Sequence, residues 1–123
     1  MRATIIAAAC AFVFTGCATL GPDAPVKIDS GVFVDYEKGM TLYTFDRDPR
    51  GRSACVTQCA ANWPPFHPAA NARAAGPFTI LAREDGTRQW MYKEKPLYFW
   101  IKDRAPGDRT GDGVNNLWRV ARP

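Results

Sequence analysis

Short apolar runs alternate with polar, glycine-rich and proline-rich segments along most of the chain. Runs of this kind, rich in β-branched and aromatic residues and bounded by turn residues, are typical of β-strands. The Glu37-Lys38-Gly39 segment joins the first two runs, and Asp85-Gly86 gives a strong short-range hairpin signal between the third and fourth. Residues 93–95 then turn the chain into the fifth run. The predicted strands cover residues 32–34, 41–45, 78–81, 88–91, 97–101 and 117–120.

One stretch has helical rather than strand-like character. It lies between residues 53 and 62, where Ser53 can cap the first turn and Pro64-Pro65 can end the helix. The chain contains ten glycines and ten prolines, which favour turns over long helices. We therefore expect a mainly β fold, a small antiparallel β domain with one or two short helical turns.

The first residues follow a different pattern, because Arg2 is followed by an uninterrupted apolar run over residues 4–14. This run is too short to cross a bilayer, which takes about 20 apolar residues. It ends in Thr15-Gly16-Cys17, and the whole segment resembles a bacterial lipoprotein signal. The resemblance implies that residues 1–16 are a signal peptide and that Cys17 receives the lipid that anchors the chain to a membrane. An ordinary secretory signal and an uncleaved anchor are the alternatives.

We expect residues 17–29 to form the lipidated tether and residues 30–123 to form a single domain. Ala18 follows the lipidated position, and the absence of Asp there favours the outer membrane, facing the periplasm, if the host is Gram-negative. The chain has 123 residues, of which 46% are hydrophobic and 12% aromatic, and this suits one small globular domain.

The formal net charge is +4, and the excess of basic side chains lies in residues 73–123. Near a membrane, such a bias favours anionic headgroups or acidic glycans as partners. Nucleic acid is not expected as a partner outside the cytoplasm.

The chain has four cysteines, and the N-terminal segment accounts for Cys10 and Cys17. Cys55 and Cys59 remain, and in an oxidising compartment they are expected to form a disulfide that holds the turn around them. A redox-active dithiol and a metal site are the alternatives. The four-residue spacing departs from the Cys-x-x-Cys redox signature, and no second cysteine pair completes a zinc site.

The mature chain repeats itself at an offset of 55 residues. The run from Leu42 to Asp48 matches the run from Leu97 to Asp103 in its leucine, tyrosine, aromatic and aspartate positions. A tryptophan stands 15 residues after each aspartate. The two half-repeats therefore span about residues 32–63 and 87–118, and we expect two pseudo-equivalent halves in one domain.

These residues resemble the predicted lipoproteins with a Tyr-x-(Phe/Tyr/Trp)-x-x-Asp motif, the secreted repeat of unknown function. The resemblance covers most of residues 30–120 and implies no particular activity. We interpret the motif side chains and the tryptophan that follows each copy as structural, with sugar stacking or a partner surface as the alternative role of the tryptophans. The residues concerned are Tyr43, Phe45, Asp48, Trp63, Tyr98, Trp100, Asp103 and Trp118.

The sequence offers little for catalysis. His67 is the only histidine, and Ser30 and Ser53 are the only serines in the mature chain; neither serine lies in a nucleophile elbow. We expect His67 to be a surface loop residue, with a role as base or metal ligand as the alternative. We accordingly predict no catalytic residue.

The aspartates near the end of the second half could suggest calcium. Asp103, Asp108 and Asp112 lie close together in sequence, but their spacing does not match a calcium-binding loop. Asp48 and Asp103 each end a strand before a loop, where a carboxylate commonly accepts backbone N–H bonds. We predict no metal and no cofactor.

These observations favour a lipid-anchored, non-catalytic module of the bacterial cell envelope, with an envelope protein or a glycan as its partner. The main alternative is a small periplasmic redox or metal-binding protein that uses Cys55 and Cys59. A hydrolase acting on wall material is the least favoured hypothesis.

Overall fold

The computed structural model describes residues 20–123, so the signal peptide, the lipidation of Cys17 and the first part of the tether lie outside the described residues. Within residues 20–123 the strands pair antiparallel in three small sheets, β1-β2, β3-β7 and β4-β5-β6. The prediction of a mainly β fold with short helical turns is confirmed. The elements are β1 (Val26–Asp29), β2 (Val32–Asp35), β3 (Tyr43–Phe45), α1 (Gln58–Asn62), β4 (Phe78–Ala82), β5 (Arg88–Tyr92), β6 (Lys95–Pro96), the 3-10 helix η1 (Val114–Asn116) and β7 (Trp118–Val120).

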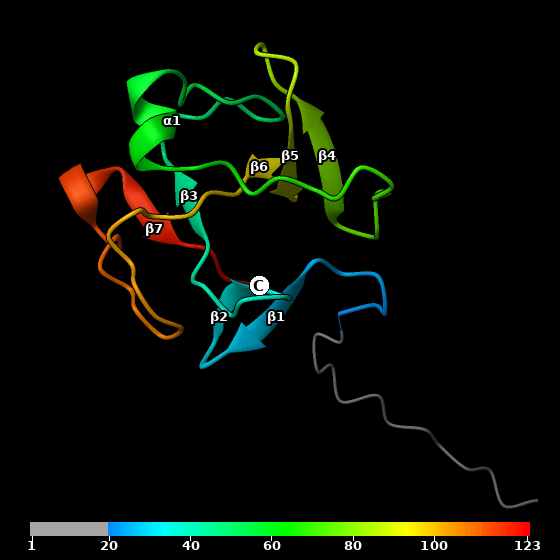
Figure 1. The fold of residues 1–123 in the computed structure, drawn as a ribbon, viewed down its shortest axis with the longest axis horizontal. Helices are drawn as coiled ribbons and strands as arrows, with labels where there is room; N and C mark the ends of the chain where they lie inside the picture. Colours follow the sequence, from blue (N-terminus) through cyan, green and yellow to red (C-terminus); the bar gives the residue numbers. More distant parts are fainter. Residues whose placement is uncertain (1–19) are drawn as a thin grey trace, which may run out of the picture.

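Two hairpins lie at opposite ends of the fold, with β3 and β7 between them (Figure 1). In the first, Ser30 and Gly31 have φ of 47° and 81° and turn the chain from β1 into β2, which a two-residue hairpin loop requires. The structured part therefore begins at Val26 or earlier, inside the segment 17–29 that we assigned to the tether. In the second hairpin, Asp85 accepts a 2.9 Å bond from the Thr87 N–H, and Gly86 has φ of 84°.

The strand expected over residues 97–101 is shorter in the structure. After β6, Tyr98 makes only isolated bridges, to Tyr43 and to Pro65. The neighbouring segment contains Pro64 and Pro65, which have no N–H and cannot continue a regular ladder. The helix also begins later than expected. Its N-cap residue is Thr57, with no side-chain cap, and Ser53 instead places its hydroxyl 2.7 Å from the Tyr98 hydroxyl.

The two halves of the chain are related by an approximate two-fold axis. At the centre, Tyr43 and Tyr98 exchange backbone hydrogen bonds of 2.8 and 2.9 Å. Because these residues are 55 apart, the pair joins one motif strand to its counterpart. The sequence repeat therefore corresponds to a repeat in the structure.

Further from the axis, backbone hydrogen bonds also occur in corresponding pairs, whose residues differ by the same 55 positions. The Ala121 N–H donates to the Leu42 carbonyl at 2.8 Å, and the Phe66 N–H donates to the Leu97 carbonyl at 2.9 Å. The segment that closes each half, at Phe66 in the first and at Ala121 in the second, thus lies beside the motif strand of the other half. Its carbonyl also accepts from the hairpin: Ala121 from Phe33, and Phe66 from Trp90, both at 2.8 Å.

Two hydrophobic clusters form the core. The first surrounds the axis and contains both motif tyrosines and two of the tryptophans; its buried members are Val32, Val34, Tyr43, Cys55, Trp63, Tyr98, Trp118 and Val120. The second lies beneath the hairpins; its buried members are Val26, Phe33, Leu42, Phe78, Trp90, Leu97 and Ala121.

Candidate functional site

The tyrosine and aspartate of the motif bind across the axis rather than within one half. The Tyr43 hydroxyl donates to Oδ2 of Asp103 at 2.6 Å, and the Tyr98 hydroxyl donates to Oδ2 of Asp48 at 2.7 Å. Both tyrosines are fully buried. Each half therefore supplies the acceptor for the other half's tyrosine, and the motif joins the two halves.

Each aspartate also binds the loop that follows it. Oδ1 of Asp48 accepts from the Ala54 N–H at 2.7 Å, and Oδ1 of Asp103 accepts from the N–H and hydroxyl of Thr110 at 3.0 and 2.6 Å. Burial raises the pKa of the Asp48 carboxyl, against the lowering effect of its two hydrogen bonds.

Burial, together with the nearby carboxylates, also raises the pKa of the Tyr43 and Tyr98 hydroxyls. These phenols are donors held in the protonated form, which suits a structural role.

Four aromatic rings form a continuous stack across the axis. Trp63 and Trp118 lie at the centre with ring centroids 3.7 Å apart and planes 3° apart. Phe45 stacks on the outer side of Trp118 at 4.3 Å, and Trp100 on that of Trp63 at 4.0 Å. The central pair is only 4% and 3% exposed, so neither ring has a face free for a ligand.

A buried polar network lies beside this core, formed by residues that no motif in the sequence marks as functional. Arg83 donates to Ser53 at 2.9 Å, to Oε1 of Gln89 at 2.6 Å and to the Cys55 carbonyl at 2.8 Å. Gln89 in turn donates to the Leu97 carbonyl at 2.7 Å. The available signal was Gln89, a polar residue that shares a strand face with the apolar Met91. The network fixes the disulfide turn against the second hairpin.

Cys55 and Cys59 form a disulfide, with their Cα atoms 5.1 Å apart. Cys55 is fully buried, and Cys59 is partly buried against the first core cluster. Thr57, between them, has φ of 54°, a value that favours glycine. The cross-link thus closes a tight turn that leads into α1.

His67 lies on the surface, where its Nδ1 is 2.6 Å from the Arg88 carbonyl oxygen. Within the described part of the chain, no group of three His, Cys, Asp or Glu side chains is placed to hold a metal ion. The three aspartates considered above as calcium ligands accept hydrogen bonds from separate backbone N–H groups. Asp103 accepts from Thr110, Asp108 from Arg104 and Ala105, and Asp112 from Val120.

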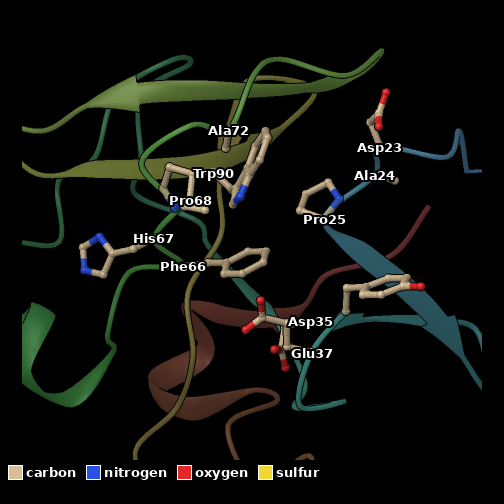
Figure 2. A pocket seen from close by; sticks show the side chains of 12 residues that line it. Asp23, Ala24, Pro25, Asp35, Glu37, Phe66, His67, Pro68, Ala72 and Trp90 are labelled. Atoms are coloured by element: carbon tan, nitrogen blue, oxygen red, sulfur yellow. The ribbon is translucent and has the colours of Figure 1, made fainter.

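A hollow of about 410 Å³ lies where the two halves meet. It is bounded by the end of the β1–β2 hairpin, the segment before β1, the loop after Phe66 and strand β5 (Figure 2). Its wall combines aromatic rings with carboxylates, namely Tyr36, Phe66, Trp90, Asp23, Asp35 and Glu37.

A second hollow, of about 490 Å³, lies beside β3 and β6. Asp48 and Phe45 reach it from the motif, and Arg50 and Glu94 form an ion pair at its wall. Lys93 and Glu94 turn the chain there with φ of 46° and 65°. Its charges are of both signs, so it favours no single class of ligand.

The sequence model of one protein family, described as a secreted repeat of unknown function, matches residues 26–67 and again residues 79–122. The chain belongs to this family. The two matches of the secreted repeat coincide with the two halves related by the axis, and the expected resemblance is confirmed. No curated protein and no solved structure matches the chain. None of the helices formed by residues 20–123 is long and apolar enough to span a membrane.

Proposed function

We propose that this protein is a lipid-anchored, non-catalytic binding module of the bacterial cell envelope. The observation that carries the proposal is that the motif which defines the repeat is used inside the fold. Tyr43 and Tyr98 are fully buried and bind the aspartates of the opposite half. The motif therefore builds a scaffold, and recognition is left to the surface hollows and loops.

The N-terminal sequence supports the anchoring. Thr15-Gly16-Cys17 follows an apolar run, as in lipoprotein signals, and the family itself is named for lipoproteins. Cys17 stands only nine residues before Val26, the first residue of β1. The lipid would hold the domain close to the membrane surface, facing the periplasm on the outer membrane of a Gram-negative host.

Fatty-acid labelling tests the anchoring. The full chain is expressed in a bacterial host that is fed an alkyne-bearing fatty acid, and membranes are separated from soluble fractions. We expect the wild type and Cys10→Ser to be labelled and membrane-bound, and Cys17→Ser to be unlabelled. Equal labelling of Cys17→Ser would contradict lipidation at this residue.

Recovery of a partner tests the binding role. The anchored protein is cross-linked in intact cells and purified beside an unrelated lipoprotein as control. An envelope protein or glycan enriched with the wild type over the control would support the proposal. The absence of any enriched component would contradict a binding module.

A redox or metal-binding function of Cys55 and Cys59 is the second candidate, and the backbone of Thr57 is the observation that favours it. A φ of 54° in a residue with a Cβ costs free energy that opening the disulfide could release. Thiol counting after equilibration with glutathione separates the two functions. A pair that cycles readily, or whose reduced form binds metal stoichiometrically, supports this candidate, whereas a bond that resists reduction supports the structural role.

A further inference from the structure

We propose that the hollow between the two halves binds a saccharide that carries free hydroxyl groups and no acidic group. The proposal rests on the binding function above and names the class of ligand. The volume of the hollow, about 410 Å³, lies within the usual range for small-ligand sites, about 300–1,000 Å³.

The indole of Trp90 is the first reason. Its side chain is 5% exposed, but its Nε1–H is not among the buried unpartnered polar atoms of residues 20–123, so this donor reaches solvent. Figure 2 shows this nitrogen at the end of the ring that points toward Phe66, inside the hollow. A donor that reaches solvent at the wall of a hollow binds water in the free protein and can donate instead to an acceptor of a bound molecule.

The break in the repeat symmetry is the second reason. Phe33 holds the position of the first half that corresponds to Trp90, since both residues make the same backbone bonds to the motif strand and the closing segment. Phe33 is fully buried and packs edge-on against Phe78 and Tyr92. In the structured part of the chain, Trp90 has no such aromatic partner. The second half thus carries a larger, polar-edged ring where the first half carries a packed one.

The chemistry of the wall selects the ligand class. Asp23, Asp35 and Glu37 supply acceptors, and in the region the structure covers no lysine or arginine lines the hollow. A hydroxyl group can both donate to these carboxylates and accept from the Trp90 N–H, whereas an ammonium group can only donate. Lys27 Nζ lies 4.4 Å from the centre of the Tyr36 ring and covers one of its faces. The other face of Tyr36 and the ring of Phe66 offer π-faces to the C–H bonds of a sugar ring.

The same wall disfavours anionic ligands. Glu37 and Asp23 are exposed and have no ion-pair partner within residues 20–123, and Asp35 is fixed in place by the N–H groups of Lys38 and Met40 at 3.0 and 2.8 Å. A uronic acid or a phosphorylated sugar would place like charges together. An amino sugar would gain from the same charges.

Calorimetric titration of the purified full-length protein in detergent tests the site. The probes are a β-1,4-linked tetramer of N-acetylglucosamine, its de-N-acetylated amine form, an oligogalacturonate and a simple diamine. We expect the neutral and amine-bearing saccharides to bind, and the oligogalacturonate to bind at least about tenfold more weakly, equivalent to one lost charge-assisted bond. No binding of either saccharide, equal binding of the acidic one, or equal binding of the diamine would each overturn the proposal.

Variants locate the binding. Trp90→Phe removes the donor but keeps a ring, and Glu37→Gln and Tyr36→Ala change exposed residues of the wall. Each should weaken binding about tenfold, while the exposed residues outside the hollow, in Glu84→Gln and Ile101→Ala, should leave it unchanged. Wild-type affinity in all three wall variants would refute the site.

The outcomes for the ligand and for the binding function can be told apart. If no saccharide binds but cross-linking still enriches an envelope component, the saccharide proposal fails and the binding module stands. If neither occurs, both fail.

Discussion

The hydroxyl of Tyr98 lies 2.7 Å from Oδ2 of Asp48, although the two residues belong to different halves of the repeat and are 50 positions apart. The pseudo-equivalent bond, from Tyr43 to Asp103, spans 60 positions at 2.6 Å. A motif repeated in one chain could have closed each copy on itself. Here the two copies exchange partners, so neither half supplies the acceptor for its own buried tyrosine hydroxyl.

Removal of one phenolic hydroxyl tests this exchange. Tyr98→Phe keeps the ring against Trp118 but removes the donor to Asp48, and we expect the free energy of unfolding to fall by about 1.5–3 kcal/mol. Tyr43→Phe should behave alike, and Tyr98→Ala should prevent folding because a large buried ring is lost. Urea denaturation measures the effect, with the exposed Tyr36→Phe as control. Wild-type stability of Tyr98→Phe would contradict the structural role of the motif.

The same tyrosines make the protein sensitive to alkali. The pKa values of both tyrosines are raised in the folded state. The contribution of the two protonated hydroxyls to the free energy of unfolding is therefore fully present below the ordinary tyrosine pKa, about 10, and is lost as the pH rises above that value. The unfolded chain then releases two protons that the folded chain keeps. We expect stability to fall by about 2.7 kcal/mol per pH unit there.

Denaturation in urea at a series of alkaline pH values measures this slope. In Tyr43→Phe only one such proton remains, and the slope should halve to about 1.4 kcal/mol per pH unit. A slope that does not change in this variant would mean that Tyr43 ionises equally in both states.

Close packing at Gly111 gives another test. A Cβ atom there would lie 2.9 Å from Cη2 of Trp63 and 2.9 Å from Cε1 of Tyr43. These distances are shorter than van der Waals contact, so the two buried rings would have to move. Gly111→Ala should therefore reduce stability by about 1–3 kcal/mol. Gly21→Ala, where a Cβ meets nothing within 4 Å, is the matched control for thermal unfolding. Equal melting of the two variants would show that the rings around Gly111 can move apart.

Local signals and the repeat were readable from the sequence, whereas long-range partners were not. The Asp85-Gly86 turn and the 55-residue offset predicted a hairpin and two halves, because both depend on residues adjacent in the chain or on simple alignment. The strand over residues 97–101 was overestimated, because its length depends on the prolines of the segment beside it.

The partner of each tyrosine could not be predicted, because the two copies of the motif offer chemically identical aspartates. The same limit applies to the surface. Arg83 and Trp90 gain their significance from what surrounds them: Arg83 from three acceptors on other segments, and Trp90 from its place in the wall of the hollow. Neither environment is encoded in a local pattern.

The disulfide should contribute to stability more than to any activity. It closes a loop of five residues, and the chain-entropy estimate for such a loop is about 2 kcal/mol. The combined replacement Cys55→Ala and Cys59→Ala should lower the free energy of unfolding by about this amount. Dithiothreitol should have the same effect on the wild type and none on the variant. If reduction leaves the melting temperature unchanged, the bond is not a structural cross-link.

The stacked tryptophans give a spectroscopic test of the axis. Trp63 and Trp118 lie 3.7 Å apart and nearly parallel, so their excited states should couple and give a pair of bands of opposite sign in the circular dichroism of the indole region. Trp63→Phe should abolish this pair of bands while preserving a ring in the stack, because Trp63 also stacks on Trp100 and the substitution removes both indole pairs. Trp90→Phe should leave it intact, because Trp90 forms no aromatic pair among residues 20–123. Since Trp63 comes from the first half and its two indole neighbours come from the second, persistence of the bands in Trp63→Phe would mean that the halves do not meet through these side chains.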